Sequence, residues 1–221
     1  MWHRSWQPIA LRSDRHLYRE LEVETKPQQH WTAVHDAQRG LAVVSDGLLE
    51  TAVRDLPQRP IALTLLRATG RTVMTDGEPD GQLQGRHTFR YWLLPLGERV
   101  NRTRLCYLGQ RLAAGLYTAQ LQPEDMALHR DEGDLPSSAS YLALEGRAVV
   151  TSVRQVDGAL EVRMFNPLEE EIEAELTLDA SYDRVQRVNL ESAPVEEVQP
   201  LVGDHLAVTL GGKEIATLRF S

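Results

Sequence analysis

The hydrophobic pattern of the chain is densest between residues 60 and 95. Residues 61–66 are mostly apolar on both faces that a strand would present, which is typical of a strand buried on two sides. Residues 87–94 alternate and carry three aromatic side chains, Phe89, Tyr91 and Trp92, and this enrichment favours a strand over a helix. The sequence therefore predicts two strands that flank a polar loop rich in Gly and Asp, residues 70–85.

Shorter strands are predicted before this stretch. One covers residues 31–35 and is followed by a turn at 36–40. Residues 41–44 and 49–53 are also β-patterned, and the segment between them contains Asp46-Gly47. Because an Asp-Gly pair readily supplies a positive φ, we expect these two strands to form a hairpin.

The pattern changes from period two to helical spacing after residue 95. Apolar side chains recur at Leu105, Leu108, Leu112 and Leu116, and Gly115 is a plausible helix stop. The sequence thus predicts a helix within residues 98–114. A strand through residues 104–108 is the competing interpretation.

Apolar and polar residues alternate regularly in the C-terminal part of the chain. In residues 172–178, Ile, Ala and Leu alternate with Glu and Thr, as expected for an antiparallel strand with one face in a core and the other in water. Similar strands are predicted at 141–144, 148–156, 160–165, 185–190, 205–210 and 215–220. Short strands at close spacing indicate a β-sandwich. We expect a mainly β, antiparallel protein with one helix: residues 1–138 form part of a large β-sandwich, and 139–221 complete it or form a small Ig-like β-sandwich.

Composition narrows the function classes. The formal net charge is -8, which argues against a nucleic-acid partner because phosphate contact requires a basic patch. The single cysteine, Cys106, excludes an internal disulfide, and we therefore expect a cytoplasmic setting. No apolar run approaches the length of a membrane span, so no membrane partner is expected.

Motifs for common chemistries are missing. The seven histidines show neither the His-Glu-x-x-His pattern nor paired Cys/His spacing, so the sequence predicts no metal site. There is also no Gly-x-Ser-x-Gly nucleophile elbow and no phosphate-binding loop. We expect no catalytic residues and no cofactor in this chain.

One ordered set of motifs resembles a known family. The first motif reads Ala62-Leu63-Thr64-Leu65-Leu66-Arg67, and it is followed by Gln82-x-x-Gly85-x-His87-x-Phe89-x-Tyr91. Further matches follow in order at Leu144-Glu145, at Val162-Arg163-Met164-Phe165-Asn166-Pro167 and at Lys213-Glu214-Ile215-Ala216-Thr217-Leu218-Arg219-Phe220. Together they resemble the C-terminal β-rich region of glycoside hydrolase family 38, the α-mannosidases, from about residue 31 onward.

The resemblance implies that the catalytic groups lie in a different domain from this region. Members of that family hold a zinc ion and an aspartate nucleophile in an N-terminal α/β domain, which this chain does not contain. Their C-terminal region is a portion of a galactose-mutarotase-like supersandwich that packs on the catalytic domain, and one of its loops reaches the edge of the substrate pocket. By this resemblance, the expected partner is an α/β catalytic domain of the same enzyme.

The candidate site residues bracket the central loop. They are Arg67, Arg71, Gln82, Arg86 and His87. Sugar hydroxyls are bound by forked donors and amides, so a mannose-containing saccharide is a further expected partner. The alternative is an ordinary hairpin loop in which Gln82 and His87 satisfy backbone groups.

Three functions remain open from the sequence. The first is a pocket-shaping, non-catalytic region of an α-mannosidase. The second is a freestanding carbohydrate-binding or interaction module that has kept the β-fold without the enzyme. The third is a sugar epimerase, which rests on shared architecture alone.

Overall fold

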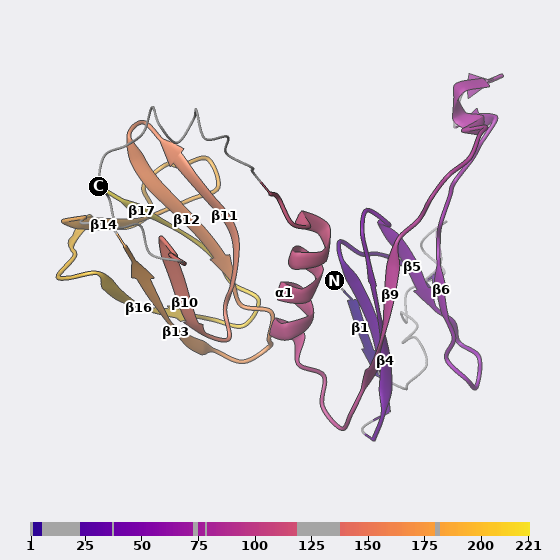
Figure 1. Ribbon diagram of the computed structural model, residues 1–221, viewed down its shortest axis with the longest axis horizontal. Coiled ribbons are helices and arrows are strands. Elements are labelled where there is room, and N and C mark those ends of the chain that lie inside the picture. Colours follow the sequence, from indigo (N-terminus) through magenta and orange to yellow (C-terminus); the bar gives the residue numbers. More distant parts are fainter. Residues whose placement is uncertain are drawn as a thin grey trace, which may run out of the picture. The chain divides into compact units, whose positions relative to one another are not determined.

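The computed structural model describes residues 2–5, 23–36, 38–72, 75–77, 79–118, 138–179 and 182–221. The chain forms two compact units, Met1–Gly115 and Leu116–Ser221. Both are built mainly of β-strands, most of them antiparallel, which confirms the predicted fold class (Figure 1). The boundary expected near residue 138 adjoins residues 119–137, which lie outside the described residues.

The N-terminal unit contains two sheets and a small hairpin. One sheet has the order β1-β3-β4-β9, in which β1 runs parallel to β3, and the other has the order β2-β5-β6. The strands are β1 (Trp2–Ser5), β2 (Thr25–Pro27), β3 (Trp31–His35), β4 (Gly40–Ser45), β5 (Glu50–Val53), β6 (Ile61–Leu63), β7 (Arg71–Thr72), β8 (Thr75–Asp76) and β9 (Tyr91–Leu96). Strands β7 and β8 pair only with each other.

The prediction of a hairpin around Asp46-Gly47 is wrong. Strand β4 pairs with β3 and β9, whereas β5 pairs with β2 and β6, so the chain crosses between two sheets here. Gly47 has a φ of 78°, which serves this crossing. The buried Gln28 side chain holds it, because its amide nitrogen donates to the Leu48 carbonyl at 2.8 Å and to Ser45 Oγ at 3.0 Å.

The two central strands are shorter than expected. Strand β6 covers only Ile61–Leu63, and Leu65 and Leu66 are 44% and 43% exposed. The prediction of a strand buried on both faces is therefore wrong, because the chain leaves the sheet after residue 63. The second strand begins only at Tyr91 and continues through Pro95.

The predicted helix is confirmed as α1 (Arg102–Ala114), which excludes the alternative strand. Asn101 caps its N-terminus, because the Asn101 side-chain oxygen accepts from the Arg104 amide at 2.9 Å. Gly115 ends the helix with a φ of 69°. No helix in the described ranges combines the length and apolar character that a membrane span requires.

Helix α1 packs on β3 and β4 through a small-residue contact. Its buried face includes Leu105, Cys106 and Gly109. A Cβ atom added at Gly109 would lie 2.5 Å from the Cβ of His30, so the helix backbone comes very close to the residue that precedes β3. Burial lowers the pKa of His30, which keeps this imidazole neutral against the helix near pH 7.

The C-terminal unit is a β-sandwich. A three-stranded sheet has the order β10-β13-β16 and a five-stranded sheet the order β11-β12-β17-β14-β15. The strands are β10 (Leu142–Gly146), β11 (Val149–Val156), β12 (Ala159–Phe165), β13 (Ile172–Leu178), β14 (Arg184–Val188), β15 (Gln199–Pro200), β16 (His205–Leu210) and β17 (Ile215–Phe220). The predicted strands of this region are confirmed, apart from shifts of one or two residues at their ends.

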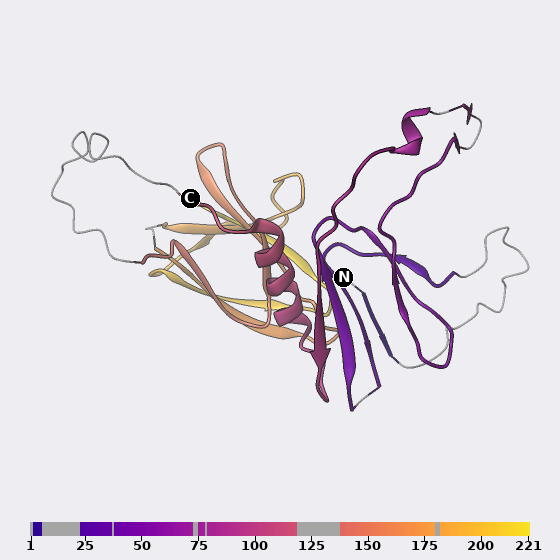
Figure 2. The same cartoon turned by 45° about the vertical axis from the view of Figure 1, so that its right-hand side comes forward.

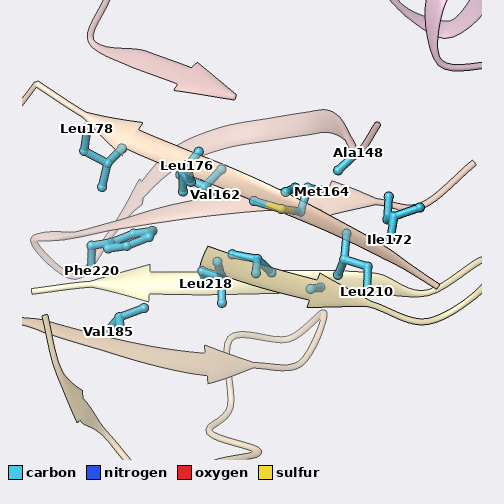
Figure 3. Close-up of a cluster of buried hydrophobic side chains, with 13 residues drawn as sticks. Ala148, Val162, Met164, Ile172, Leu176, Leu178, Val185, Leu210, Leu218 and Phe220 are labelled. Atoms are coloured by element: carbon cyan, nitrogen blue, oxygen red, sulfur yellow. The ribbon is translucent and has the colours of Figure 1, made fainter. Parts of the chain in front are cut away.

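The core of this unit is made by the inner residues of both sheets. Figure 3 shows Met164, Leu176, Leu210 and Phe220 pointing toward one another between the strands. All four are fully buried. The alternation of β13 places Ile172, Ala174, Leu176 and Leu178 in this core and its glutamates outside, as the sequence predicts.

A buried asparagine joins the two connections between these sheets. Asn166 follows β12, and its amide nitrogen lies 2.7 Å from the Glu170 carbonyl, 3.2 Å from that of Leu210 and 2.9 Å from that of Gly211. Its side-chain oxygen accepts from the Leu168 amide at 2.9 Å. The β12–β13 and β16–β17 connections are therefore bound to one side chain.

Replacing Asn166 with Ala should destabilise the protein strongly. The change removes the buried side-chain amide that donates to the Glu170, Leu210 and Gly211 carbonyls, and we expect a loss of about 3 kcal/mol in the free energy of unfolding. Urea unfolding followed by circular dichroism measures this loss. The matched control is Gln155→Ala on the exposed part of β11, which should change the stability by less than about 0.5 kcal/mol. Equal effects of the two variants would contradict the role given to Asn166.

Candidate functional site

The central polar loop is a long arm, defined here as residues 64–90. It joins β6 of one sheet to β9 of the other and contains the β7–β8 hairpin and the short 3-10 helix η2 (Pro79–Gln82). Figures 1 and 2 both show the arm leaving the strands of its unit and extending beyond them. Residues 65–70 and 82–88 are exposed. These two stretches of the arm are thus accessible to solvent.

Two glycines let the limbs of the arm meet. The Thr69 amide donates to the Gly81 carbonyl at 2.9 Å, and a Cβ atom at Gly81 would collide with the Thr69 carbonyl oxygen. A Cβ atom at Gly70 would lie 2.7 Å from the side-chain nitrogen of Gln82. Small residues are therefore required where the limbs touch, which explains the Gly-rich composition of this loop.

The base of the arm is anchored by the carboxylate of Glu50. One oxygen accepts from Thr64 Oγ1 at 2.8 Å, and the other lies 3.2 Å from Arg67 Nη1. The Thr64 amide also donates to the Glu50 carbonyl at 3.1 Å. On the second limb, Arg90 forms an ion pair of 2.5 Å with Asp46. Both limbs are therefore fixed where they leave the sheets.

The five predicted site residues occupy different places on the arm. Arg67 lies at its base, where it borders a surface depression together with Glu50 and Lys26. Gln82 lies against Gly70 on the opposite limb. His87 donates from Nε2 to the Leu83 carbonyl at 2.7 Å, and its ring stacks on Phe89 at a centroid distance of 6.2 Å.

The remaining two arginines present their side chains to solvent. Arg71 and Arg86 are both exposed. Arg71 follows Gly70, which lies against Gln82, whereas Arg67 pairs with Glu50 at the base of the arm. The structure thus brings Gln82 close to the Gly70–Arg71 region. It does not gather all five residues into one cluster, and His87 satisfies a backbone group as the alternative interpretation expects.

Sequence reasoning missed the residues that position the arm. Glu50 and Asp46 were seen only as parts of strand and turn patterns. The available signal was a carboxylate at the start of β5, whose other residues, Thr51 to Val53, are buried. Arg67, the last residue of the motif Ala62–Arg67, supplies a cation for this carboxylate.

A second polar cluster lies on the five-stranded sheet of the C-terminal unit. Glu161 is only 1% exposed and lies between Arg154 of β11 and Arg219 of β17. Arg154 donates to one carboxylate oxygen at 2.8 and 3.1 Å, and Arg219 lies 2.9 Å from the other. Ser192 Oγ donates to Glu161 at 3.0 Å from the loop that follows β14.

The electrostatics of Glu161 favour its charged form. Burial alone acts to raise the pKa of this carboxyl, but the hydrogen bonds from Ser192 and Arg154 and the charges of both arginines outweigh burial and hold the pKa below its usual range. A carboxylate with its donors already in place is neither a general acid near neutral pH nor an open ligand. The cluster therefore fastens the Ser192 loop to the sheet.

Within the described residues, no three His, Cys, Asp or Glu side chains lie together in a way that could hold a metal ion. These residues do not fit the zinc site of the resembled family, and we assign no chemical step to zinc in this chain.

Comparison with known proteins supports one assignment. Residues 148–218 match the family model described as the glycosyl hydrolases family 38 C-terminal beta sandwich domain. Among solved structures, an alpha-mannosidase from Enterococcus faecalis V583 matches 89% of this chain with a TM-score of 0.70 and 27% sequence identity. The chain resembles the C-terminal region of glycoside hydrolase family 38. No curated protein matches it.

The family 38 likeness extends through both units, because the match covers most of the chain. A second structure, a protein in the glycosyl hydrolase family 38 from Enterococcus faecalis, gives the same TM-score of 0.70 and the same 27% identity over 89% of this chain. The chain spans only 21% and 22% of the lengths of these two proteins. The predicted resemblance is confirmed, and the activity of a whole family 38 enzyme remains a matter for proposal.

Removing the anchor at the base should loosen the arm without unfolding the protein. In Glu50→Ala, Thr64 and Arg67 lose their carboxylate partner, and the amides of residues 64–70 should exchange with solvent at least several-fold faster. The free energy of unfolding should change by less than about 1 kcal/mol because the Arg67 side chain is 74% exposed and solvent screens the ion pair. Hydrogen exchange with mass spectrometry measures the first effect. The matched control is Asp55→Ala, which removes an ion pair to Arg59 outside the arm; faster exchange of the arm in that variant would count against the anchor.

Acid should weaken the C-terminal unit through Glu161. Since the pKa of folded Glu161 lies below its unfolded value of about 4.3, its stabilisation is complete above that pH and is lost as the pH falls through the lowered pKa. Urea unfolding between about pH 5 and pH 2 should therefore show a steeper fall for the wild type than for Glu161→Gln. Glu145→Gln on the exposed strand β10 is the control and should keep the wild-type slope. Parallel curves for the wild type and Glu161→Gln would refute this assignment.

Proposed function

We propose that this chain is the C-terminal, non-catalytic region of an α-mannosidase-like glycoside hydrolase. The observation that carries the proposal is the match of 89% of the chain to an alpha-mannosidase of which it spans only 21%. Its partner would be the α/β catalytic domain of the same enzyme, which would supply the zinc ion and the nucleophile. The sequence lacks the metal-binding, nucleophile-elbow and phosphate-binding motifs, which supports a role in packing and in shaping the site.

The arm is the part that we propose to border the substrate pocket. It extends beyond the sheets of its own unit, and its base is fixed by Glu50 and Asp46. Its exposed guanidinium and amide groups at Arg71, Gln82 and Arg86 are donors of the kind that bind sugar hydroxyls. A stacked His87–Phe89 pair adds an aromatic surface beside these donors. These features support contact with a mannose-containing saccharide at the rim of the pocket.

The cellular setting is part of the same proposal. Cys106 is the only cysteine and lies on the buried face of α1, so the protein needs no oxidising compartment for its fold. A cytoplasmic enzyme of mannose metabolism accords with this cysteine usage.

The proposal can be tested by changing the arm in the enzyme that contains this chain. Arg71→Ala and His87→Ala should each lower kcat/KM for an aryl α-mannoside by about tenfold, which corresponds to about 1.4 kcal/mol of lost transition-state binding. Arg39→Ala, which alters an exposed arginine of the same unit at the β3–β4 turn, should leave the kinetics unchanged. Wild-type kinetics in both arm variants would rule out the pocket-shaping role.

Activity and binding assays on the isolated 221-residue chain distinguish a region of an enzyme from a freestanding module. We expect it to hydrolyse no aryl α-mannoside, with or without added zinc. Calorimetry with mannose and α-linked manno-oligosaccharides should show no binding tighter than the millimolar range, because the pocket would need the catalytic domain. Micromolar binding by the chain alone would favour the freestanding carbohydrate-binding module instead.

A further inference from the structure

Strand β9 forms one edge of the four-stranded sheet of the N-terminal unit. Its six residues, Tyr91-Trp92-Leu93-Leu94-Pro95-Leu96, contain no charged side chain. On one side it pairs with β4 along its whole length, and among the described residues no strand pairs with its other side. An uncharged apolar edge of this length is a template for pairing with another chain.

The backbone of β9 directs a regular set of groups away from β4. The Asp46 amide donates to the Arg90 carbonyl at 3.2 Å, so this pair is a hydrogen-bonded one. Because such pairs alternate along an antiparallel ladder, Trp92, Leu94 and Leu96 bond to β4 and the residues between them face outward. The Ser45 amide donates to His30 on the β3 side at 2.7 Å, which is the pattern this alternation requires.

The outward-facing set is suited to receive a strand. It offers the amides of Tyr91 and Leu93 and the carbonyls of Tyr91, Leu93 and Pro95. Pro95, the third residue of this outward-facing set, removes no hydrogen bond to β4, since its nitrogen faces the open side. The open edge thus keeps two donors and three acceptors in line.

Side-chain burial falls abruptly at the same edge. Val43 of β4 is 5% exposed, whereas its register partner Leu93 is 60% exposed. The neighbouring pair shows the same step, with Ser45 at 1% and Tyr91 at 50%. Whatever covers this face over β4 therefore stops short of β9, and two large apolar side chains remain in water.

Three of the four edge strands of the C-terminal unit carry protective features, whereas β16 (His205–Leu210) has no Asp, Glu, Lys or Arg. Strand β11 carries a bulge between Val150 and Ser152 and the charged Arg154. Strand β10 carries Glu145, and the edge strand β15 is only two residues long. Bulges, charges and short length are the usual devices that prevent edge pairing.

We infer that β9 is completed by a β-strand from the remainder of a longer family 38 polypeptide, which pairs with its open edge and covers Tyr91 and Leu93. This inference rests on the proposed function. The solved relatives are about five times longer than the matched region, since the chain spans 21% and 22% of them, so they contain ample polypeptide to supply such a strand. The donated strand would carry apolar side chains on the face shared with Leu93.

The first test uses the isolated 221-residue chain and amide hydrogen exchange resolved to single residues by NMR. The amides of Trp92 and Leu94 should be protected, because they bond to β4. The amides of Tyr91 and Leu93 should exchange at least a hundredfold faster. Equal protection of all four would show that the edge is already closed and would overturn the inference.

The second test identifies the occupant. Leu93 is replaced by photoreactive p-benzoylphenylalanine in the polypeptide as the source cell makes it, and the cross-linked peptide is sequenced by mass spectrometry. We expect a peptide from outside residues 1–221 that belongs to an α-mannosidase sequence. The same replacement at Val202, an exposed apolar position of the C-terminal unit, should not give that peptide. A cross-link only to residues 1–221, in the same or a second copy, would overturn the inference.

The third test measures the consequence for the enzyme. Leu93→Lys should lower the α-mannosidase activity recovered with this region at least tenfold, whereas Val202→Lys should leave it unchanged. Retained protection of the Trp92 and Leu94 amides shows that the Leu93→Lys sheet is still folded. If the recovered wild-type protein has no α-mannosidase activity, both the proposed function and this inference are contradicted. Recovery of active enzyme with no external cross-link from position 93 contradicts the inference alone.

Discussion

The C-terminal unit depends on the hydrogen bonds of one buried amide. Asn166 lies where β12 leaves the five-stranded sheet, and it binds carbonyl groups of the β16–β17 connection as well as of its own. The two connections approach so closely that a Cβ atom at Gly212 would collide with the Glu169 carbonyl. Lys213 then takes a positive φ of 62° and donates from its amide to the Leu168 carbonyl at 3.0 Å. With both crossings tied together, the inner faces of the two sheets keep the register that buries Met164 and Phe220.

The N-terminal unit uses the same principle at Gln28 but remains open elsewhere. Gln28 binds the crossing from β4 to β5, and Thr32 donates to its side-chain oxygen at 2.6 Å, so this buried polar group is satisfied within the unit. The arm and the β9 edge, in contrast, present donors and apolar side chains to solvent. Both units also expose large apolar side chains, among them Leu93 of the N-terminal unit and Val202 of the C-terminal unit.

The sequence predicts the fold well where alternation is governed by one core face. Strand β13 has glutamates on one side and aliphatic residues on the other, and its structure follows directly from that pattern. Asn101 and Gly115 likewise bound the helix at positions that local chemistry favours. The prediction fails around Gly47 and Leu65. A positive φ at Gly47 serves a hairpin and a sheet crossing equally, and only the buried Gln28 decides between them. Leu65 and Leu66 have the composition of a buried strand, but β6 ends at Leu63 and both side chains are exposed.

The candidate site is predictable as a segment but not as a geometry. The motif from Arg67 to Tyr91 identifies the arm, because Gly, Arg and aromatic residues are concentrated there. Which side chains are held and which are presented depends on long-range partners such as Glu50 and Asp46, and no local pattern encodes those pairings.

The contact between α1 and His30 limits how this protein can be engineered for heat resistance. Exchanging a mid-helix glycine for alanine is a standard route to a higher melting temperature, with a gain of about 1 kcal/mol in helix propensity. At Gly109 the added methyl group would meet His30 at 2.5 Å, so thermostabilisation by that rule would push the helix off its sheet.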